Sequence, residues 1–573
     1  MFAASTLLAI LAGSTLSQAQ FNNPPGVDIW CGKAYRATNA SFNPGGWFEE
    51  PEKSSVPLLN FKVKPRMNLY LDGEETGSFL VDASISDLVG QPFPPANASS
   101  SAGEGSHLFV DILLDGNSSA LASKASVTIG DSAEISFDIS AFAARLEPYN
   151  VTAIATLGQD NSTTFTASTQ FSKLPLRTDN GTVTRLDNLY GGLSVRKAAS
   201  TAWDPVFPYT YYVQWSLYWY ANLSTLDDFS AMGYNLIHIV PTGDLGEDPF
   251  PWDAFQPYLD RAAELGLYFQ YDVRWEPTNL TAATEHVARL ASHPAILLWY
   301  TGDEPDGKSN PTNSTRLAYD AIRALDPYHP VSLALNCHDF HYAAYAAGAD
   351  IVLSDVYPVS TNTSWSTVYE TPCNATYGCC GCDGCSGAFE DISDRLDAFR
   401  HRDDVLGWTK THWGAPQAFG NETFWTRYPT ADEEVVMDLL SVNHGAKGLV
   451  MWNFPVTQEI LGATNALAGV LTGEKVGGYL IGAPLTRGLE VSGAERVDAA
   501  AWVKEESVLV SVVNLEYADV AGGVTVRLPE GVEAESVEES FWGEAEWSVD
   551  GDTISVGSLA GLEVSLVELK RSS

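Results

Sequence analysis

Between residues 206 and 483, short apolar runs alternate with helix-like patterns, and this alternation limits the possible folds more than any other feature of the chain. Alternating strands and helices build a parallel sheet. The candidate strands are 211–216, 235–240, 268–273, 296–301, 331–336, 351–356, 408–413 and 448–452. Eight such units in about 270 residues match the size of a (β/α)₈ barrel. We therefore expect an α/β fold with a central TIM barrel at 206–483, in which a late helix begins at a capping box formed by Thr430 and Glu433.

The segments on either side of the barrel follow a different pattern. Residues 20–205 are rich in Thr, Ser, Gly and Asn, and polar side chains alternate with apolar ones in stretches such as 126–129 and 134–139. Residues 484–573 alternate in the same way, for example at 507–513, 523–526 and 562–569. Short alternating strands separated by turns are typical of β-sandwiches. The sequence predicts an N-terminal β-sandwich at 20–205 and a C-terminal β-sandwich at 484–573.

The first residues have the composition of a secretory signal peptide. Residues 1–20 carry no charge, residues 7–12 form a short apolar core, and Ser17 and Ala19 supply the small side chains of a cleavage site. We expect residues 1–19 to be removed and the protein to be secreted. No later stretch reaches the ~18–20 apolar residues that a membrane span needs, so we expect no membrane segment.

Glycosylation and charge agree with an extracellular location. The chain has twelve Asn-x-Ser/Thr sequons, the acceptor pattern of N-glycosylation. They lie at Asn39, Asn97, Asn117, Asn150, Asn161, Asn180, Asn222, Asn279, Asn313, Asn362, Asn374 and Asn421. A formal charge of −40, from 72 acidic and 32 basic residues, argues against nucleic acid and anionic membranes as partners, because both require Lys and Arg patches.

Seven cysteines are present, and five of them lie within 373–385. Thiolates at such spacing can hold zinc, but in an oxidising compartment disulfides are favoured. We therefore expect a loop stapled by disulfides at 373–385. Because seven is an odd number, one thiol is left over. The sequence favours Cys337, since this residue follows an apolar strand.

Carboxylates and aromatic rings gather where the predicted strands end, which is the end of a TIM barrel that carries the active site. Carboxylic acids perform the proton transfers of glycosidic bond cleavage, and aromatic rings offer flat apolar faces to sugars. The side chains at these ends include Asp272, Trp275, Asp303, Glu304, Asp355, Tyr357, Trp413, Gln417 and Trp452. The pattern indicates a carbohydrate site, with no metal or other cofactor expected, because no metal-ligand spacing occurs at the strand ends.

The residues of the fourth strand end make a resemblance visible. Asp303-Glu304-Pro305 resembles the Asn-Glu-Pro signature of the clan A glycoside hydrolases, here of a secreted, fungal type. The resemblance implies that Glu304 is the general acid/base. It also implies that Trp452 is a sugar platform and that Tyr357 takes the place of a tyrosine that contacts the nucleophile. A sandwich before the barrel and another after it are similar to many members of that clan.

Two departures from the clan pattern leave the mechanism open. Asp303 replaces the clan's asparagine, and Gln417 stands where the resemblance places a glutamate nucleophile. A glutamine cannot serve as that carboxylate. One alternative is that another carboxylate of the rim acts in its place; the candidates are Asp355, Asp272, Glu276 and Asp244.

A second alternative is that the substrate supplies its own nucleophile. The adjacent Asp303 and Glu304 are similar to the pair in β-N-acetylhexosaminidase families, where the aspartate orients the acetamido group. A third is that hydrolysis has been lost and the protein only binds carbohydrate. Glu304 could also be a structural acid at a helix start, next to Pro305.

We expect a glycoside hydrolase acting on O-glycosidic bonds of oligo- or polysaccharides. Its catalytic residues are predicted to be Glu304, Asp303 and Asp355. Its substrate-binding residues are predicted to be Trp452, Tyr357, Asp272, Trp275, Gln417 and Trp413. The partner is a carbohydrate substrate, and the sequence does not determine the oligomeric state.

Overall fold

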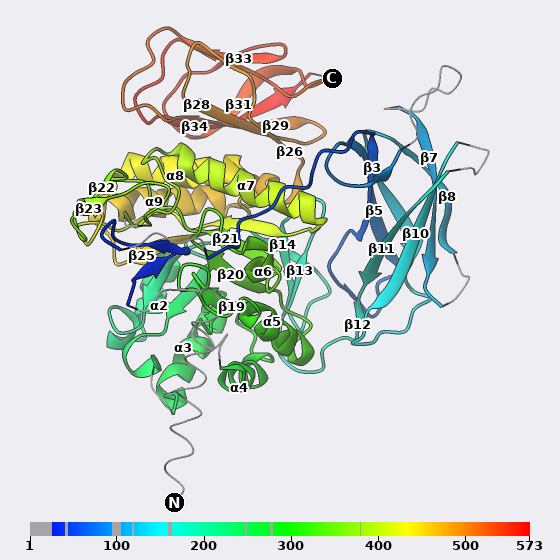
Figure 1. The fold of residues 1–573 in the computed structure, drawn as a ribbon, viewed down its shortest axis with the longest axis horizontal. Helices are drawn as coiled ribbons and strands as arrows, with labels where there is room; N and C mark the ends of the chain where they lie inside the picture. The colour runs from blue at the N-terminus through cyan, green and yellow to red at the C-terminus, as the bar shows by residue number, and fades with distance from the viewer. Residues whose placement is uncertain are drawn as a thin grey trace, which may run out of the picture.

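The computed structural model describes residues 26–39, 44–93, 105–116, 120–158, 163–246, 249–274, 279–378 and 380–572. Figure 1 shows a helix-covered barrel, one sheet-rich region beside it and a second one above it. The predicted signal peptide at 1–19 lies outside the described residues. No described helix combines the length and the apolar character that crossing a membrane requires.

Eight parallel strands close the central barrel in the order β16-β17-β18-β19-β20-β21-β24-β25. They are Tyr209–Gln214 (β16), Leu236–Val240 (β17), Tyr268–Asp272 (β18), Ile296–Asp303 (β19), Val331–Leu335 (β20), Ile351–Ser354 (β21), Thr411–Gly414 (β24) and Leu449–Phe454 (β25). Each predicted strand overlaps one of these, so the predicted (β/α)₈ barrel is confirmed. Strands β17, β18 and β20 are buried along their whole length, as expected for parallel strands covered on both faces.

Helices cover the outside of the barrel (Figure 1). They are Thr225–Ala231 (α2), Trp252–Leu265 (α3), Leu280–Leu290 (α4), Ser314–Leu325 (α5), Tyr342–Ala346 (α6), Glu390–Leu406 (α7), Ala431–Asn443 (α8), Gln458–Leu471 (α9) and Glu474–Gly482 (α10), with 3₁₀ turns at Trp219–Ala221 (η1) and Gly243–Gly246 (η2). Helix α8 begins at the predicted capping box, in which Thr430 and Glu433 satisfy each other's backbone N–H groups.

The N-terminal sheet-rich region contains two four-stranded sheets, ordered β6-β3-β5-β9 and β11-β10-β7-β8. Their strands are Leu58–Pro65 (β3), Thr76–Ser86 (β5), Gln91–Pro92 (β6), His107–Leu114 (β7), Ala120–Thr128 (β8), Ser132–Asp138 (β9), Tyr149–Leu157 (β10) and Thr164–Phe171 (β11). The rings of Phe79, Phe137 and Phe171 pack between the sheets, with the centroid of Phe137 4.7 Å from Phe79 and 5.2 Å from Phe171. This is the expected N-terminal sandwich, although its boundary at 205 stays a prediction.

A small sheet lies at the amino-terminal end of the barrel. It consists of Val183–Leu186 (β13), Leu193–Arg196 (β14) and Asp204–Val206 (β15). A separate parallel pair joins Tyr70–Leu71 (β4) to Lys173–Leu174 (β12). Leu186 and Val195 share one buried cluster with Leu236, Tyr268 and Ile351, which begin barrel strands. Apolar side chains therefore fill the interior of the barrel at its amino-terminal end.

The C-terminal region is a second sandwich of two sheets, ordered β26-β28-β29-β34-β31 and β27-β30-β33-β32. Its strands are Leu485–Arg487 (β26), Val491–Ser492 (β27), Val497–Val503 (β28), Ser507–Asn514 (β29), Val524–Arg527 (β30), Ala534–Trp542 (β31), Ser548–Asp550 (β32), Thr553–Val556 (β33) and Val564–Arg571 (β34). Trp502 and Leu566 are buried in the same cluster as Leu439 and Leu440 of α8, so this sandwich packs on the barrel helices.

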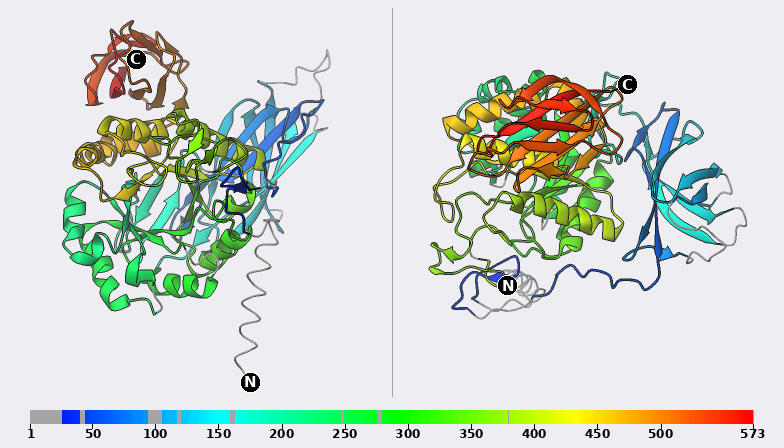
Figure 2. Two further views of the ribbon diagram at one scale, coloured as in Figure 1. Left: turned by 60° about the vertical axis from the view of Figure 1, so that its left-hand side comes forward. Right: turned by 90° about the horizontal axis from the view of Figure 1, so that it is seen from above.

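The first described residues lie against the barrel rather than in the N-terminal sandwich, as Figure 2 shows. This N-terminal arm pairs Ile29–Trp30 (β1) with Lys33–Ala34 (β2). The indole N–H of Trp30 donates to Asn336 at 2.7 Å, and a disulfide joins Cys31 to Cys337 across 306 residues of sequence. The arm is therefore fastened to the end of β20, at the carboxyl end of the barrel.

This disulfide corrects the expectation that Cys337 is the unpaired thiol. The apolar strand before Cys337 ends beside the arm, where Cys31 meets it. Among the described residues, the free cysteine is the buried Cys380. The predicted stapled loop is present, because Cys382 and Cys385 form a disulfide and Cys373 is also disulfide-bonded. The same loop contains the short pair Trp365–Ser366 (β22) and Thr371–Pro372 (β23).

Candidate active site

A cavity of about 160 Å³ opens where the barrel strands end. It is lined by Tyr212, Asp303, Glu304, Asp355, Tyr357, Phe419, Glu422, Trp425 and Trp452. These side chains come from strands β16, β19 and β25 and from the loops after β21 and β24, so the closed barrel is what brings them together. A larger cavity lies at the opposite end of the barrel, away from these carboxylates.

Glu304 is the first residue after strand β19, and its backbone is held in an unusual conformation. Its N–H donates to the carbonyl of Ala334 on β20 at 3.1 Å, and its φ is +50°. A side chain other than glycine rarely adopts this left-handed region, and such residues gather at functional sites. The side chain of Glu304 lines the cavity.

Asp303, the last residue of β19, is surrounded by donors. Its carboxylate lies 2.8 Å from Arg274 Nη1 and 2.8 Å from Lys308 Nζ, and it accepts a 3.0 Å hydrogen bond from the hydroxyl of Tyr300. Burial acts to raise the pKa of Asp303, but the charges of Arg274 and Lys308 prevail and lower it to about 2. Asp303 is therefore a permanent anion at neutral pH.

Glu304 behaves in the opposite way. Burial first, and the charge of Asp303 second, raise the pKa of Glu304 to about 7. The two adjacent carboxyl groups thus have widely separated pKa values, one ionised and the other close to half-protonated at neutral pH. This difference between neighbouring carboxyls is the arrangement that separates a general acid from its charged partner.

Asp355, which follows strand β21, forms a hydrogen bond with Glu304 through its side chain. Burial and the negative charge of Glu304 raise the pKa of Asp355 well above its usual range. Asp355 is therefore the protonated member of the pair and donates to Glu304. Tyr357 lies close enough that, after burial, the charges of Asp355 and Glu304 raise its pKa well above the ordinary value.

Aromatic rings form the walls around these carboxyls. The rings of Tyr357 and Phe419 are 5.0 Å apart, and those of Phe419 and Trp425 are 4.7 Å apart. The indole N–H of Trp425 donates to the carbonyl of Tyr357 at 3.0 Å, which ties the loop after β24 to the loop after β21. On the other side, Trp452 packs at 5.3 Å on Tyr212.

Asp272 does not line this cavity, and its predicted contact with substrate stays a prediction. It is 6% exposed, and its oxygens are occupied by His238 Nε2 at 2.8 Å and by Arg274, through the backbone N–H at 2.8 Å and Nε at 2.7 Å. Because Arg274 also holds Asp303, Asp272 fixes the position of the cation that keeps Asp303 ionised.

Gln417 and Trp413 also lie away from the cavity. Gln417 is fully buried, and its amide is used by backbone groups, accepting from Val359 N–H and donating to the carbonyls of Val359 and Phe419. Trp413 is buried in the barrel interior under Gly448. Both were expected to bind substrate, but their side chains point into the packed structure. Trp275 lies outside the described residues.

The structure adds residues that sequence reasoning missed. Glu422 lines the cavity from the loop after β24, and in the sequence it is the middle residue of the Asn421 sequon, which drew attention only to glycosylation. Arg274 follows Asp272 by two residues at the end of a predicted strand, and this spacing was the feature of the sequence that could have indicated it. Tyr35 of the N-terminal arm lies close enough to respond to the site. Burial and Tyr369 contribute most to raising the pKa of Tyr35, and the charge of Glu304 raises it further. Nothing in the sequence around Tyr35 indicates that it lies near Glu304.

Comparisons with known proteins were made for the whole chain. No curated protein sequence matches it. Among solved structures it is similar to a β-glucuronidase from Ruminococcus gnavus, with 12% identity, a TM-score of 0.31 and coverage of 70% of this chain and 62% of that one. A family 39 glycoside hydrolase from Bacteroides cellulosilyticus gives 10% identity, a TM-score of 0.41 and coverage of 88% and 100%.

A family 5 glycoside hydrolase from Bacteroides vulgatus gives 13% identity, a TM-score of 0.44 and coverage of 64% of this chain and 90% of that one. The chain thus spans 62% of the length of the glucuronidase it matches. These overall likenesses are too distant to carry an argument about function.

A family match over part of the barrel is more informative. Residues 257–371 match the glycosyl hydrolases family 2, TIM barrel domain. The matched segment includes Asp303, Glu304, Asp355 and Tyr357, which line the cavity. Part of the barrel of this chain is therefore similar to a glycoside hydrolase barrel domain.

Proposed function

We propose that the protein hydrolyses O-glycosidic bonds of oligo- or polysaccharides, with Glu304 as the proton donor to the leaving oxygen. The observation that carries the proposal is the separation of the Asp303 and Glu304 pKa values, to about 2 and about 7, inside one sugar-sized cavity. A general acid must hold its proton near working pH and release it in the transition state. Asp303 keeps that proton on Glu304 by its fixed negative charge.

Asp355 is proposed to tune Glu304 rather than to attack the sugar. In retaining enzymes the acid and the nucleophile are ~5–5.5 Å apart, and in inverting enzymes the acid and base are ~6.5–9.5 Å apart, because the scissile bond lies between them. A carboxyl hydrogen-bonded directly to Glu304 leaves no room for that bond. The hydrogen bond from Asp355 acts to lower the pKa of Glu304, against burial and Asp303, and it orients the Glu304 carboxyl group.

Glu422 is proposed as the second catalytic carboxylate. It lines the same cavity as Glu304 but comes from a different wall, together with Phe419 and Trp425. Its loop follows β24, the seventh strand of the barrel, from which the clan pattern expects the second carboxylate. Glu422 thus replaces the function that Gln417, with its amide bonded to the backbone, does not provide.

The substrate-assisted alternative is less well supported by the contacts of Asp303. To orient an acetamido group, this carboxylate would have to accept from the substrate, but Arg274, Lys308 and Tyr300 already bind it. The cavity volume of about 160 Å³ is below the ~300–1,000 Å³ common for larger ligands. This volume favours a single sugar unit, stacked against Trp452, and hence release of one unit at a time.

Secretion and N-glycosylation form part of the proposal. The composition of residues 1–19 and the twelve sequons support them. The disulfides support them as well, because such bonds persist in oxidising compartments.

The proposal is tested by hydrolysis of a panel of aryl glycosides that includes hexosides, pentosides, glucuronides and N-acetylhexosaminides. The purified protein is compared with Glu304→Gln and with Glu285→Gln, a control at an exposed glutamate of α4. We expect turnover that falls by about 10²–10⁴ in Glu304→Gln and is unchanged in the control. Turnover confined to N-acetylhexosaminides would favour the substrate-assisted mechanism. Sugar binding without turnover by any of the proteins would establish the non-catalytic alternative.

A further inference from the structure

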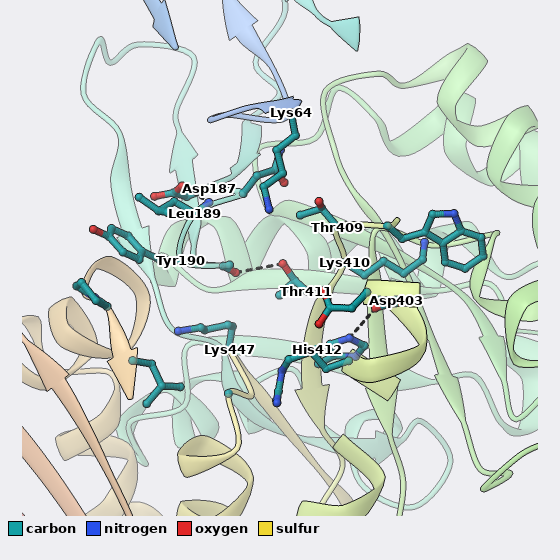
Figure 3. A pocket seen from close by; sticks show the side chains of 18 of the residues that line it. Lys64, Asp187, Leu189, Tyr190, Asp403, Thr409, Lys410, Thr411, His412 and Lys447 are labelled. Carbon is teal, nitrogen blue, oxygen red and sulfur yellow. Dashed lines mark hydrogen bonds and ion pairs between the residues drawn. The ribbon is translucent and has the colours of Figure 1, made fainter. Parts of the chain in front are cut away.

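A second cavity, of about 430 Å³, lies at the amino-terminal end of strands β24 and β25, where the three regions of the chain meet. Lys64 reaches it from β3 of the N-terminal sandwich, Lys410 and Lys447 from the segments before β24 and β25, and Arg487 from β26 of the C-terminal sandwich. Figure 3 shows the side chains of Lys64, Lys410 and Lys447 arranged around it. With Arg400 of α7, five cations line one cavity of a chain whose formal charge is −40.

Three acids also line the cavity, but each one already has a partner. The pairs, at 2.7 to 3.8 Å, are Asp187 with Arg66, Asp403 with Tyr342 and His412, and Asp404 with Lys62. Arg66 and Lys62 do not line the cavity, so Asp187 and Asp404 are neutralised from outside it, whereas Asp403 is bonded to an uncharged tyrosine and to His412. Five lining cations thus face three lining acids, two of which are already paired with cations outside the cavity.

Lys447 and Lys410 illustrate this imbalance. Lys447 Nζ donates to the carbonyl of Leu480 at 2.6 Å, and Lys410 Nζ donates to the carbonyl of Ala349 at 2.6 Å. Neither lysine forms an ion pair within the described part of the chain. Burial lowers the pKa of Lys447 to about 8 and also lowers the pKa of Lys410, because the loss of water outweighs the attraction of the nearby Asp187 and Asp403.

The other three cations, Lys64, Arg400 and Arg487, add positive charge around the same cavity. A side chain at Gly445 would lie 3.3 Å from the guanidinium of Arg400 and 4.0 Å from that of Arg487, so both groups reach one edge of the cavity. Arg400 is paired with Asp397 at 2.7 Å, and Lys64 lies 3.9 Å from Asp82, whereas Arg487 has no ion pair among the described residues. Cations gathered around one cavity repel one another unless an anion lies between them.

His412 adds a buried ring nitrogen to the lining of the same cavity. It is 6% exposed, and its Nε2 is paired with Asp403 at 2.8 Å. Its other ring nitrogen, Nδ1, is buried and has no partner in the described part of the chain. A buried polar atom without a partner costs free energy unless a ligand or water satisfies it.

We propose that this cavity binds a small polyvalent oxyanion, bearing phosphate or several carboxylates, which links the barrel to the two sandwiches. Lys64, Lys447 and Arg487 contribute one cation from each of the three regions, and the anion would neutralise all three at once. Such a ligand stabilises the assembled arrangement of domains, since only that arrangement brings the three cations together. The site is remote from Glu304 and does not depend on the proposed hydrolysis.

The test is isothermal titration calorimetry of the full chain at pH 7, with inorganic phosphate and citrate as probes and ionic strength held constant with NaCl. We expect saturable 1:1 binding, a matching rise in melting temperature, and no such effect of acetate or a neutral disaccharide. Tighter binding of phosphate would assign the site to phosphorylated ligands, and tighter binding of citrate would assign it to carboxylated ones.

Variants locate the binding. The double variant Lys64→Gln/Arg487→Gln changes two side chains that are not fully buried and should weaken binding at least tenfold. The control Arg527→Gln/Lys570→Gln removes two exposed cations of the C-terminal sandwich that do not line the cavity and should bind as the original protein does. Absence of saturable binding of either probe, or equal affinities of the double variant and the control, would overturn the proposal.

Discussion

The carboxyl groups of Glu304 and Asp355 share a hydrogen bond, although strand β20 separates their two strands in the barrel. The bond exists because both residues follow strand ends that converge on one cavity. Two buried carboxyls this close cannot both ionise, so one proton is retained by the pair. Together with the fixed anion at Asp303, this pair sets the acidity of the site.

The pH dependence of hydrolysis should report Glu304. Its pKa is raised to about 7, and a general acid is active when protonated, so kcat/KM should fall as the pH rises through about 7. Asp303→Asn removes a charge that raises the pKa of Glu304, so the fall in kcat/KM should move to lower pH by roughly one unit. Lys308→Met removes a charge that lowers the pKa of Glu304, so the fall in kcat/KM should move to higher pH. Shifts in the same direction for both variants would contradict this assignment.

Glu422 should be as important for turnover as Glu304. Glu422→Ala removes the second carboxylate and should lower kcat by about 10²–10⁴. Added azide or formate can enter the space left by the side chain and should restore part of the activity. If Glu422 only supported the loop, these anions would restore no activity. Glu422→Gln, which keeps the size of the side chain, should be equally inactive. Full activity of either variant would exclude Glu422 from catalysis.

The Cys31–Cys337 disulfide should stabilise both the fold and the site. It closes a long loop and holds the arm that carries Tyr35, whose pKa responds to Glu304. Cys31→Ser/Cys337→Ser should lower the free energy of unfolding by about 2–4 kcal/mol and also lower kcat/KM. The matched control is Cys380→Ser, at the free buried cysteine, which leaves that disulfide intact. Chemical denaturation and aryl glycoside hydrolysis measure the two effects.

His444 should make the contact between the barrel and the C-terminal sandwich depend on pH. Although burial acts to lower it, hydrogen bonds to Asp397 at 2.9 Å and Asp498 at 3.1 Å raise the pKa of His444 to about 9. A group whose folded pKa is raised stabilises the fold fully below its unfolded value of about 6.5 and loses this effect as the pH rises through about 9.

The comparison that checks this is urea unfolding of His444→Gln and of the original protein at pH 6 and pH 9.5. The variant should be less stable at pH 6, by up to about 3 kcal/mol, and the difference should be small at pH 9.5. A difference that is equal at both pH values would mean that the charge of His444 does not contribute.

The sequence by itself determined the barrel and the place of the adjacent Asp303 and Glu304 at the end of one of its strands. Apolar runs such as those of β17 and β20 can only be buried on both faces, and eight of them alternating with helices leave few other folds. Asp303 and Glu304 could be placed at a strand end for the same reason, since the end of an apolar run is visible in the sequence. Both conclusions depend on local periodicity.

Only the tertiary structure decided which side chains meet. The pairing of Cys31 with Cys337, the contact of Asp355 with Glu304 and the presence of Glu422 in the cavity join residues far apart in the chain. The direction of a side chain after a strand depends on the turn that follows, which turned the Gln417 amide to the backbone of Val359. Local periodicity encodes the strands, whereas closure of the barrel sets the distances between their ends.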